Sequence, residues 1–171
     1  MSEIIIREPK MEDAKLLLDY FNELMEEKTY LIYTEKLTLR EEKEWLRNVL
    51  ERMKKNQMIF LLAEADGRVI GTVRMERRKG REEHLVDFGI AVSKDYRGRG
   101  IGKMLWNACY KRAKKLWGNE VKYIVLHVFE NNDIAQNFYR RLGFKEVARI
   151  PNAVKWNDGS LIAQIVMMRE F

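Results

Sequence analysis

The sequence predicts an α/β fold in which a mixed, mostly antiparallel sheet of about seven strands combines with four helices. Three observations indicate this class: apolar residues at helical spacing in four segments, short apolar runs between turn residues in seven others, and a helix that crosses between two strands in mid-chain. The 171 residues, 46% of them hydrophobic, are enough to bury a core. We expect one domain over residues 1–171.

The chain begins with one predicted strand and two predicted helices. Ile4 to Arg7 forms the strand, which Pro9 ends. Apolar residues recur at helical spacing from Met11 to Met25, which predicts the first helix. Thr38 and Glu41 have the spacing of a capping box, so a second helix is expected to begin there.

Three predicted strands follow the second helix. Residues 58–65 and 69–77 flank Asp66-Gly67, which is a strong signal for an antiparallel hairpin. Residues 85–92 form the next strand, in which Gly89 predicts a bulge or a close backbone approach.

The second half of the chain alternates helices and strands. Apolar spacing predicts a long helix from Ile101 to the Gly118 stop, a strand over 121–128 and a helix over 132–142. A last antiparallel pair is expected over 144–150 and 161–168. The order is therefore β-α-α-β-β-β-α-β-α-β-β, and the helix between the fourth and fifth strands makes the sheet mixed.

A glycine-rich loop, Arg97 to Lys103, precedes the long helix. Its alternating glycines let N–H groups converge on an anion at the positive end of the helix dipole, and Arg97, Arg99 and Lys103 add cationic side chains. The spacing excludes a dinucleotide loop, because Lys103 stands where the last glycine of G-x-G-x-x-G is required. A nucleoside-triphosphate loop is excluded because Met104 stands where Ser or Thr is required. The loop predicts a site for a different phosphate group.

This loop and a second motif resemble the GNAT superfamily of acyl-CoA-dependent N-acyltransferases. The form R-G-x-G-x-G is similar to the family's pyrophosphate loop, and Leu126 to Phe144 fills every fixed position of its signature L-x-V-x-x-x-N-x-x-A-x-x-x-Y-x-x-x-G-F. The resemblance covers roughly Leu85 to Met168. Asn132 and Tyr139, seven residues apart, share one helix face, although Asn132 also suits an N-cap and Tyr139 also suits the core.

The resemblance implies acetyl-CoA as co-substrate, which enters where the fourth and fifth strands splay apart, and it implies no metal. Backbone groups of the fourth strand would pair with the pantetheine arm, and the glycine loop would hold the pyrophosphate. The expected cofactor-binding residues are Ile90, Ala91, Val92, Arg97, Gly98, Arg99, Gly100, Ile101, Gly102, Lys103, Asn132 and Tyr139.

The implied reaction is direct transfer of an acetyl group to a primary amine. Tyr139 is predicted to be the general acid for the leaving thiolate. The general base is expected on or near the fourth strand, where Asp87 is our choice and Glu83 and His84 are alternatives. His127 on the fifth strand is another possibility. A non-catalytic acyl-CoA-binding module, acting as a sensor or docking protein, is the competing hypothesis.

The resemblance places the acceptor site between the loop after the first helix and the last hairpin. Tyr30, Tyr33, Glu35 and Trp156 form either an aromatic and acidic pocket for a cationic amine or a loop packed on its own domain. Ala163-Gln164 stands where many similar chains carry an acidic pair, so their substrates do not transfer to this chain. The candidate acceptors are a small primary amine, an amino acid or amino sugar, and the N-terminus or a lysine of a protein.

The charge and composition of the sequence limit the kinds of partner that the protein can bind. The net charge of +6 suits an anionic cofactor, an acidic protein or nucleic acid, but acidic residues are interspersed among the basic ones, which favours a solvated surface over a nucleic-acid site. No apolar run approaches the ~20 residues of a membrane span, and Met1 to Ile6 lacks the features of a secretion signal. We expect a cytoplasmic protein without a membrane partner. The lone Cys109 suits a core thiol, and the sequence leaves a homodimer open.

Overall fold

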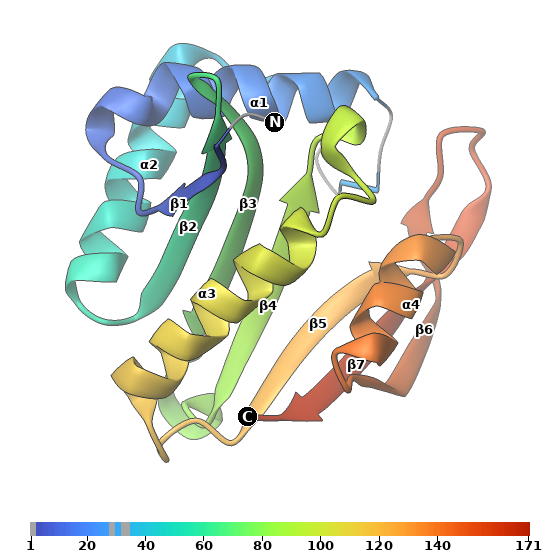
Figure 1. The fold of residues 1–171 in the computed structure, drawn as a ribbon. Coiled ribbons are helices and arrows are strands. Elements are labelled where there is room, and N and C mark those ends of the chain that lie inside the picture. Colours follow the sequence, from blue (N-terminus) through green and yellow to red (C-terminus); the bar gives the residue numbers. More distant parts are fainter. Residues whose placement is uncertain (1–2, 28–29, 32–34) are drawn as a thin grey trace.

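Seven strands form one sheet in the order β1-β2-β3-β4-β5-β7-β6 in the computed structural model, which describes residues 3–27, 30–31 and 35–171 (Figure 1). All neighbouring strands are antiparallel except β4 and β5, which are parallel. The predicted mixed, mostly antiparallel α/β fold is confirmed. The strands are β1 (Ile5–Arg7), β2 (Met58–Ala65), β3 (Arg68–Arg77), β4 (Leu85–Val92), β5 (Tyr123–Phe129), β6 (Lys145–Lys155) and β7 (Leu161–Glu170).

Four α-helices and three short 3-10 turns connect these strands within the described residues. They are η1 (Met11–Asp13), α1 (Ala14–Glu26), α2 (Leu39–Lys54), η2 (Gly80–Glu82), η3 (Lys94–Tyr96), α3 (Ile101–Trp117) and α4 (Asp133–Arg141). In Figure 1, α3 crosses in front of the N-terminal half of the sheet and α4 in front of the C-terminal half.

Local sequence signals define several element ends. Asp66 and Gly67 have φ angles of 52° and 71°, and a two-residue type I′ hairpin turn requires positive φ at both positions. The capping box of α2 is confirmed: Thr38 accepts a hydrogen bond from the backbone N–H of Glu41, whose carboxylate accepts one from the N–H of Thr38 at 2.8 Å.

Two expectations about the strands were wrong. β3 and β4 pair without a register shift, so Gly89 forms no bulge. A Cβ at Gly89 would lie 3.1 Å from Nε of Arg74, so this glycine makes room for a side chain rather than for a backbone. The sixth strand does not end at Ile150: it continues past Pro151, because it is an edge strand with a register shift in this stretch, where a proline is tolerated.

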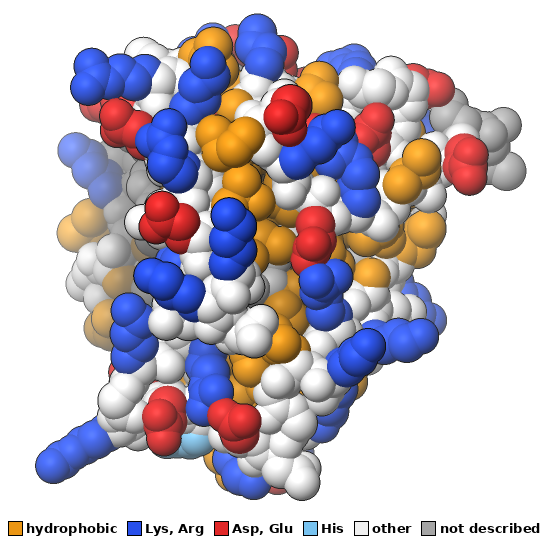
Figure 2. Space-filling model, turned by 90° about the vertical axis from the view of Figure 1, so that its left-hand side faces the viewer, with side chains coloured by type: hydrophobic (Ala, Val, Ile, Leu, Met, Phe, Trp, Pro, Cys, Tyr) orange, Lys and Arg blue, Asp and Glu red, His pale blue; other side chains and the backbone are white. Residues whose placement is uncertain are grey.

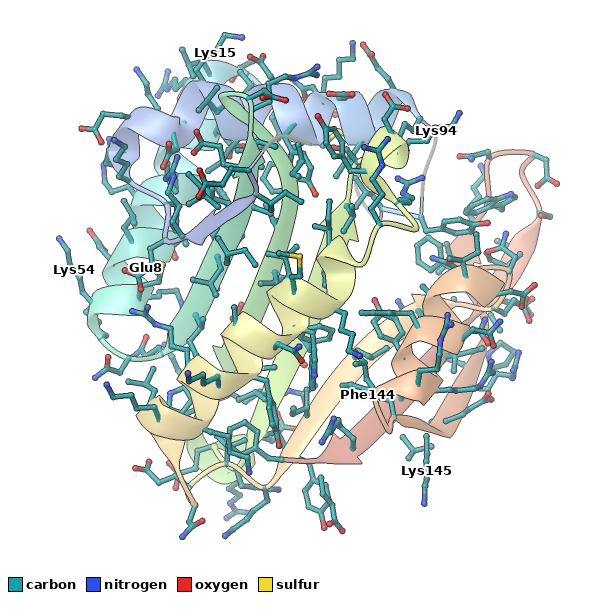
Figure 3. All side chains as sticks on the ribbon, viewed as in Figure 1. Glu8, Lys15, Lys54, Lys94, Phe144 and Lys145 are labelled. Atoms are coloured by element: carbon teal, nitrogen blue, oxygen red, sulfur yellow. The ribbon has the colours of Figure 1, made fainter. Side chains whose placement is uncertain are left out.

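The helices build a separate core on each face of the sheet. Leu17 of α1 and Leu46 of α2 are buried with side chains of β2 and β3. On the other face, α3 and α4 pack over β4, β5 and β7, and the ring of Phe144 contacts those of Trp106 and Tyr139. Figure 3 shows Phe144 between α3 and α4.

Acidic and basic side chains are mixed on the surface. On the face that Figure 2 shows, Lys and Arg side chains lie among Asp and Glu and among hydrophobic side chains. Arg7 illustrates the pairing, because its guanidinium contacts both Asp13 at 2.7 Å and Glu64 at 2.6 Å. No helix in the described part of the chain combines the length and the apolar character that crossing a membrane requires.

Glu42 places a carboxyl group in the interior of the protein. Glu42 is 0% exposed, and neither of its side-chain oxygens has a hydrogen-bond partner among the residues that the structure describes. Burial disfavours the charged form and raises the pKa of Glu42 to about 7.

We expect the stability of the protein to fall as the pH rises from 4.5, the ordinary pKa of a glutamate, to about 7, because the folded state holds this proton more tightly than the unfolded state. Glu42→Gln should therefore raise the free energy of unfolding by ~1–3 kcal/mol above pH 7 and give no such gain at pH 4.5. Urea unfolding at both pH values measures this, with the exposed Glu44→Gln as the control. An equal effect of Glu42→Gln at both pH values would contradict the assignment.

Candidate active site

The parallel strands β4 and β5 pair at one end only. Residues 85–87 of β4 pair with 123–125 of β5, and from Phe88 onward the two strands diverge, as Figure 1 shows. The predicted splay between the fourth and fifth strands is confirmed. Beyond Asp87, the β5-facing edge of β4 therefore has no strand partner in the described part of the chain.

The alternation of hydrogen bonds between β3 and β4 determines which backbone groups face this gap. The N–H of Ser93 donates to the carbonyl of Ile70 at 2.9 Å, and in an antiparallel ladder every second residue pair exchanges such bonds. Ala91 is therefore bonded to β3, whereas Ile90 and Val92 turn their N–H and C=O groups toward the gap. The Ala91 carbonyl also accepts the hydroxyl of Tyr20 at 2.8 Å.

The glycine-rich loop joins β4 to α3 at the diverging end of the strands. Gly98 and Gly100 have φ angles of 74° and 82°, which favour glycine. The N–H of Met104 donates to the carbonyl of Gly100, the N-cap of α3, at 3.1 Å, so the N–H groups of residues 101–103 precede the hydrogen-bond ladder of the helix. Together with the helix dipole, these groups can hold an anion.

The cationic side chains of the loop differ in their contacts. Nε of Arg97 donates to the carbonyl of Val92 at 2.9 Å, and its terminal nitrogen pairs with Glu27 at 2.6 Å. The guanidinium of Arg99 lies 5.3 Å from the ring centre of Tyr96. Arg99 and Lys103 are exposed, whereas Arg97 is bound into the fold on two sides.

Helix α4 lies against the beginning of α3. A Cβ added to Gly102 would lie 3.4 Å from the ring of Phe138, an ordinary van der Waals contact, so Phe138 of α4 lies directly over the first turn of α3. At the start of α4, the side chain of Asn132 accepts a hydrogen bond from the N–H of Ala135 at 3.1 Å. Asn132 therefore fills the N-cap position that its residue type favours.

Tyr139 is buried beside the point where the strands separate. Tyr139 is 7% exposed, and its ring meets the ring of Phe88 edge-on with 6.1 Å between centroids. Phe88 is the first residue of β4 beyond the segment that pairs with β5. Burial raises the pKa of Tyr139 to about 12, because it disfavours the phenolate. The phenol therefore keeps its proton at neutral pH.

Asp87 lies on the opposite face of the sheet from Tyr139. Its neighbours Val86 and Phe88 are buried in the same cluster as Tyr139, and side chains alternate between the faces of a strand. Both carboxylate oxygens of Asp87 are bound by Arg78, at 2.7 and 2.9 Å. Asp87 stands at the paired end of β4, in a polar groove that it lines together with Asn48, Arg52, Glu76, Arg77, Lys79 and Glu82.

His127 also lies on the face opposite Tyr139, but farther along β5. Leu126 and Val128 are buried in the Tyr139 cluster, so the imidazole points to the other side and is exposed. Nδ1 of His127 lies 3.2 Å from Oε1 of Gln164. With that oxygen as acceptor, Nδ1 carries the proton and Nε2 presents a lone pair. The other two candidate bases, Glu83 and His84, are exposed in the turn before β4.

Tyr30 in the loop after α1 and Trp156 in the last hairpin contact each other and Phe129, the last residue of β5. Tyr30 stacks on Trp156 with 5.2 Å between centroids, and Phe129 meets both rings edge-on. The hydroxyl of Tyr30 donates to the carbonyl of Asn131 at 3.2 Å. The structure thus brings together the two segments expected to form the acceptor site, but the facing surfaces of Tyr30 and Trp156 cover each other. Glu35 is exposed, and Tyr33 lies outside the described residues.

Glu27 is a contact of the loop that sequence reasoning missed. It is the C-cap residue of α1 and precedes Arg97 by 70 positions, so no local motif connects the two residues. One signal was present: an acidic residue at a helix C-terminus is opposed by the helix dipole, which indicates a partner elsewhere.

Comparison with known proteins identifies relatives of this arrangement. Residues 17–144 match the Acetyltransferase (GNAT) family. The N-alpha-acetyltransferase of Sulfurisphaera tokodaii is 34% identical over an alignment of 109 residues. The alignment covers 57% of this chain and 63% of that protein, so it spans less than two thirds of the relative.

Solved structures share the whole fold. A GNAT-family acetyltransferase from Streptococcus pneumoniae superposes with a TM-score of 0.85 at 22% identity, covering 99% of this chain and 100% of that one. A GNAT phosphinothricin acetyltransferase from Sinorhizobium meliloti, solved with AcCoA, gives 0.83 at 19% identity, covering 100% and 89%. Since the family match extends from α1 to the residue that precedes β6, the chain belongs to the Acetyltransferase (GNAT) family.

Proposed function

We propose that this protein is an N-acetyltransferase that transfers the acetyl group of acetyl-CoA directly to a primary amine. The observation that carries the proposal is the gap between β4 and β5, which opens beside the glycine loop at the start of α3. The similar fold of the S. meliloti enzyme, solved with AcCoA, supports the same ligand here. When bound, acetyl-CoA supplies the thioester carbonyl that an amine attacks.

The residues along the gap suit this co-substrate. Ile90 turns its N–H and C=O, and Val92 its N–H, toward the gap, where an extended amide chain can add like a strand; the Val92 carbonyl accepts Nε of Arg97. The N–H groups of residues 98–103 suit a diphosphate, and the exposed Arg99 and Lys103 add positive charge. The N–H of Val92 is available for an oxygen that becomes negative during the reaction.

Tyr139 is proposed as the general acid. Its phenol keeps its proton because its pKa is raised to about 12, and its ring contacts Phe88 where the gap begins. Tyr139 donates to the departing sulfur while the carbon–sulfur bond breaks.

The acceptor, an ammonium ion at neutral pH, must lose one proton before it attacks the thioester, and we propose His127 as the base that takes this proton. A second proton leaves the nitrogen as the amide forms and balances the proton that Tyr139 gives to the sulfur. Its exposed imidazole lies on the face opposite Tyr139, beyond the paired end of β5, and Nε2 has a lone pair. Asp87, the choice from sequence, is less suited because Arg78 binds both of its oxygens.

We propose the α-amine of a polypeptide as the acceptor. On the face of the sheet opposite Tyr139, the carboxylates of Glu76 and Asp87 are paired with Arg52 and Arg78, so neither is free to hold an additional ammonium group. An α-amine has a pKa of about 8, against about 10.4 for a lysine side chain, and thus releases its proton to a histidine more easily. The N-alpha-acetyltransferase activity named for the S. tokodaii relative supports this class.

The proposal is tested by measuring the release of free CoA thiol with two peptides of the same sequence, which contains one internal lysine. The first peptide has a free α-amine, and the second has a blocked N-terminus, so that only its lysine can react. We expect the first peptide to react at least ~10-fold faster. Equal rates would exclude α-amine preference. Binding of acetyl-CoA without turnover of any amine would support the non-catalytic alternative.

The same assay distinguishes the two bases. His127→Gln should lower kcat/KM by ~100-fold, the usual contribution of a general base. Asp87→Asn should change kcat/KM far less. The reverse result would return the role of base to Asp87.

A further inference from the structure

Glu27 lies between the first helix and the glycine loop. Its side chain is only 14% exposed, and one oxygen pairs with Arg97 at 2.6 Å while the other accepts the backbone N–H of Lys94 at 3.3 Å. Figure 3 shows Lys94 beside the end of α1. One carboxylate therefore holds both ends of the turn that leads from β4 into the loop.

The position of Glu27 is unfavourable for the helix that carries it. A negative charge at a helix C-terminus is opposed by the helix dipole, and a largely buried carboxylate also loses hydration. The guanidinium of Arg97 offsets both effects. The placement of Glu27 is thus explained by the loop it contacts and not by the stability of α1.

Arg97 carries this contact to the edge of the gap. Its Nε donates to the carbonyl of Val92, the last residue of β4, so one guanidinium joins the end of α1 to the end of β4. Two of its three nitrogens are engaged in these contacts, and the third, Nη1, makes no hydrogen bond to the residues that the structure describes, so its donors can face a further acceptor. If Arg97 left Glu27 for a phosphate, it would leave a largely buried carboxylate beside an anionic ligand. The pair is therefore expected to persist when the ligand binds.

A second contact from the same helix supports this connection. Tyr20 precedes Glu27 by seven residues, nearly two helical turns, so both side chains lie on one face of α1. The buried hydroxyl of Tyr20 donates to the carbonyl of Ala91 at 2.8 Å. Tyr20 and the C-cap residue Glu27 therefore contact three positions at the end of β4 and in the adjoining turn and loop, Ala91, Lys94 and Arg97, and Arg97 in turn binds Val92.

We propose that Glu27 is a positioning residue for acetyl-CoA. Glu27 acts through Arg97, which binds the carbonyl of Val92, and thereby holds the end of β4 and the glycine loop in the geometry that binds acetyl-CoA. This inference rests on the proposed function, because it assigns acetyl-CoA to that loop. By thermodynamic reciprocity, a ligand that binds the ordered loop must also stabilise the last turn of α1.

Glu27→Gln tests the proposal, since it keeps the shape of the side chain and removes the charge that pairs with Arg97. We expect the Kd and the KM for acetyl-CoA to rise by about 10-fold, while kcat stays within about twofold. Arg97→Gln should have a similar effect, and the double variant should be no weaker than the more affected single variant, because both changes break one contact.

Glu23→Gln is the matched control. Glu23 lies on the same helix and also pairs with an arginine, Arg68, at 3.0 Å, but Arg68 begins β3 at the hairpin turn and is not part of the loop. This variant should bind acetyl-CoA like the wild-type protein. An equal loss in the control would show a general effect on α1 and overturn the inference.

Hydrogen exchange gives a second measurement, which needs only the wild-type protein if Glu27→Gln fails to fold. Acetyl-CoA should slow exchange in residues 24–27, and the Glu27→Gln variant should lose this protection. Normal affinity in that variant, or no protection in the wild-type protein, would overturn the inference while leaving the proposed function in place. A wild-type protein that does not bind acetyl-CoA would overturn both.

Discussion

Gly100→Val is expected to weaken acetyl-CoA binding by at least ~100-fold while the protein remains folded. Gly100 has a φ of 82°, and a β-branched side chain is strongly disfavoured there. A Cβ at this position would meet nothing within 4 Å, so the effect must come from the backbone and not from a clash. The loop must then change conformation, and the N–H groups of residues 101–103 no longer converge on a diphosphate. Each lost hydrogen bond to a charged group costs about 1.5–3 kcal/mol.

Gly67→Val provides the control for this experiment. Gly67 has a φ of 71° and also meets nothing within 4 Å, but it lies in the turn between β2 and β3. Both variants should lose ~1–2 kcal/mol of stability from the strained backbone. Only Gly100→Val should lose affinity in a calorimetric titration with acetyl-CoA. Unchanged affinity in folded Gly100→Val protein would refute the assignment of the loop.

The sequence predicted those parts of the fold that local rules determine. The turn at Asp66-Gly67, the capping box at Thr38 and the N-cap at Asn132 each depend on residues within a few positions of one another, and all three were found where local chemistry places them. The splay of β4 and β5 was expected from the family resemblance, since no local pattern indicates where two parallel strands separate.

The remaining features depend on contacts between distant segments. The pairing of Arg78 with Asp87 requires β3 and β4 to be in register, and the contact between Glu27 and Arg97 requires α1 to end above β4. Hydrophobic periodicity gives the face of a side chain but not its partner. For this reason the sequence named Asp87 as a base without revealing that a guanidinium binds both of its oxygens.

Tyr139→Phe is expected to lower kcat by ~100-fold, the contribution of a single general acid, with little change in KM for acetyl-CoA. Phenylalanine keeps the ring that packs against Phe88 and Phe144, so only the proton donor is removed. Because the pKa of Tyr139 is raised to about 12, its phenol stays protonated at pH 10, and the wild-type enzyme should lose no activity from its ionisation up to that pH.

Tyr110→Phe separates the loss of this donor from a general effect on aromatic packing. Tyr110 stacks on Trp106, which contacts Phe144 in the same cluster, but it lies toward the C-terminal half of α3 and contacts Phe171 at the end of the chain. This variant should keep the wild-type kcat. Equal losses in both variants would assign the effect to packing. Full activity in Tyr139→Phe would exclude Tyr139 as the general acid, because phenylalanine keeps the ring and removes only the hydroxyl.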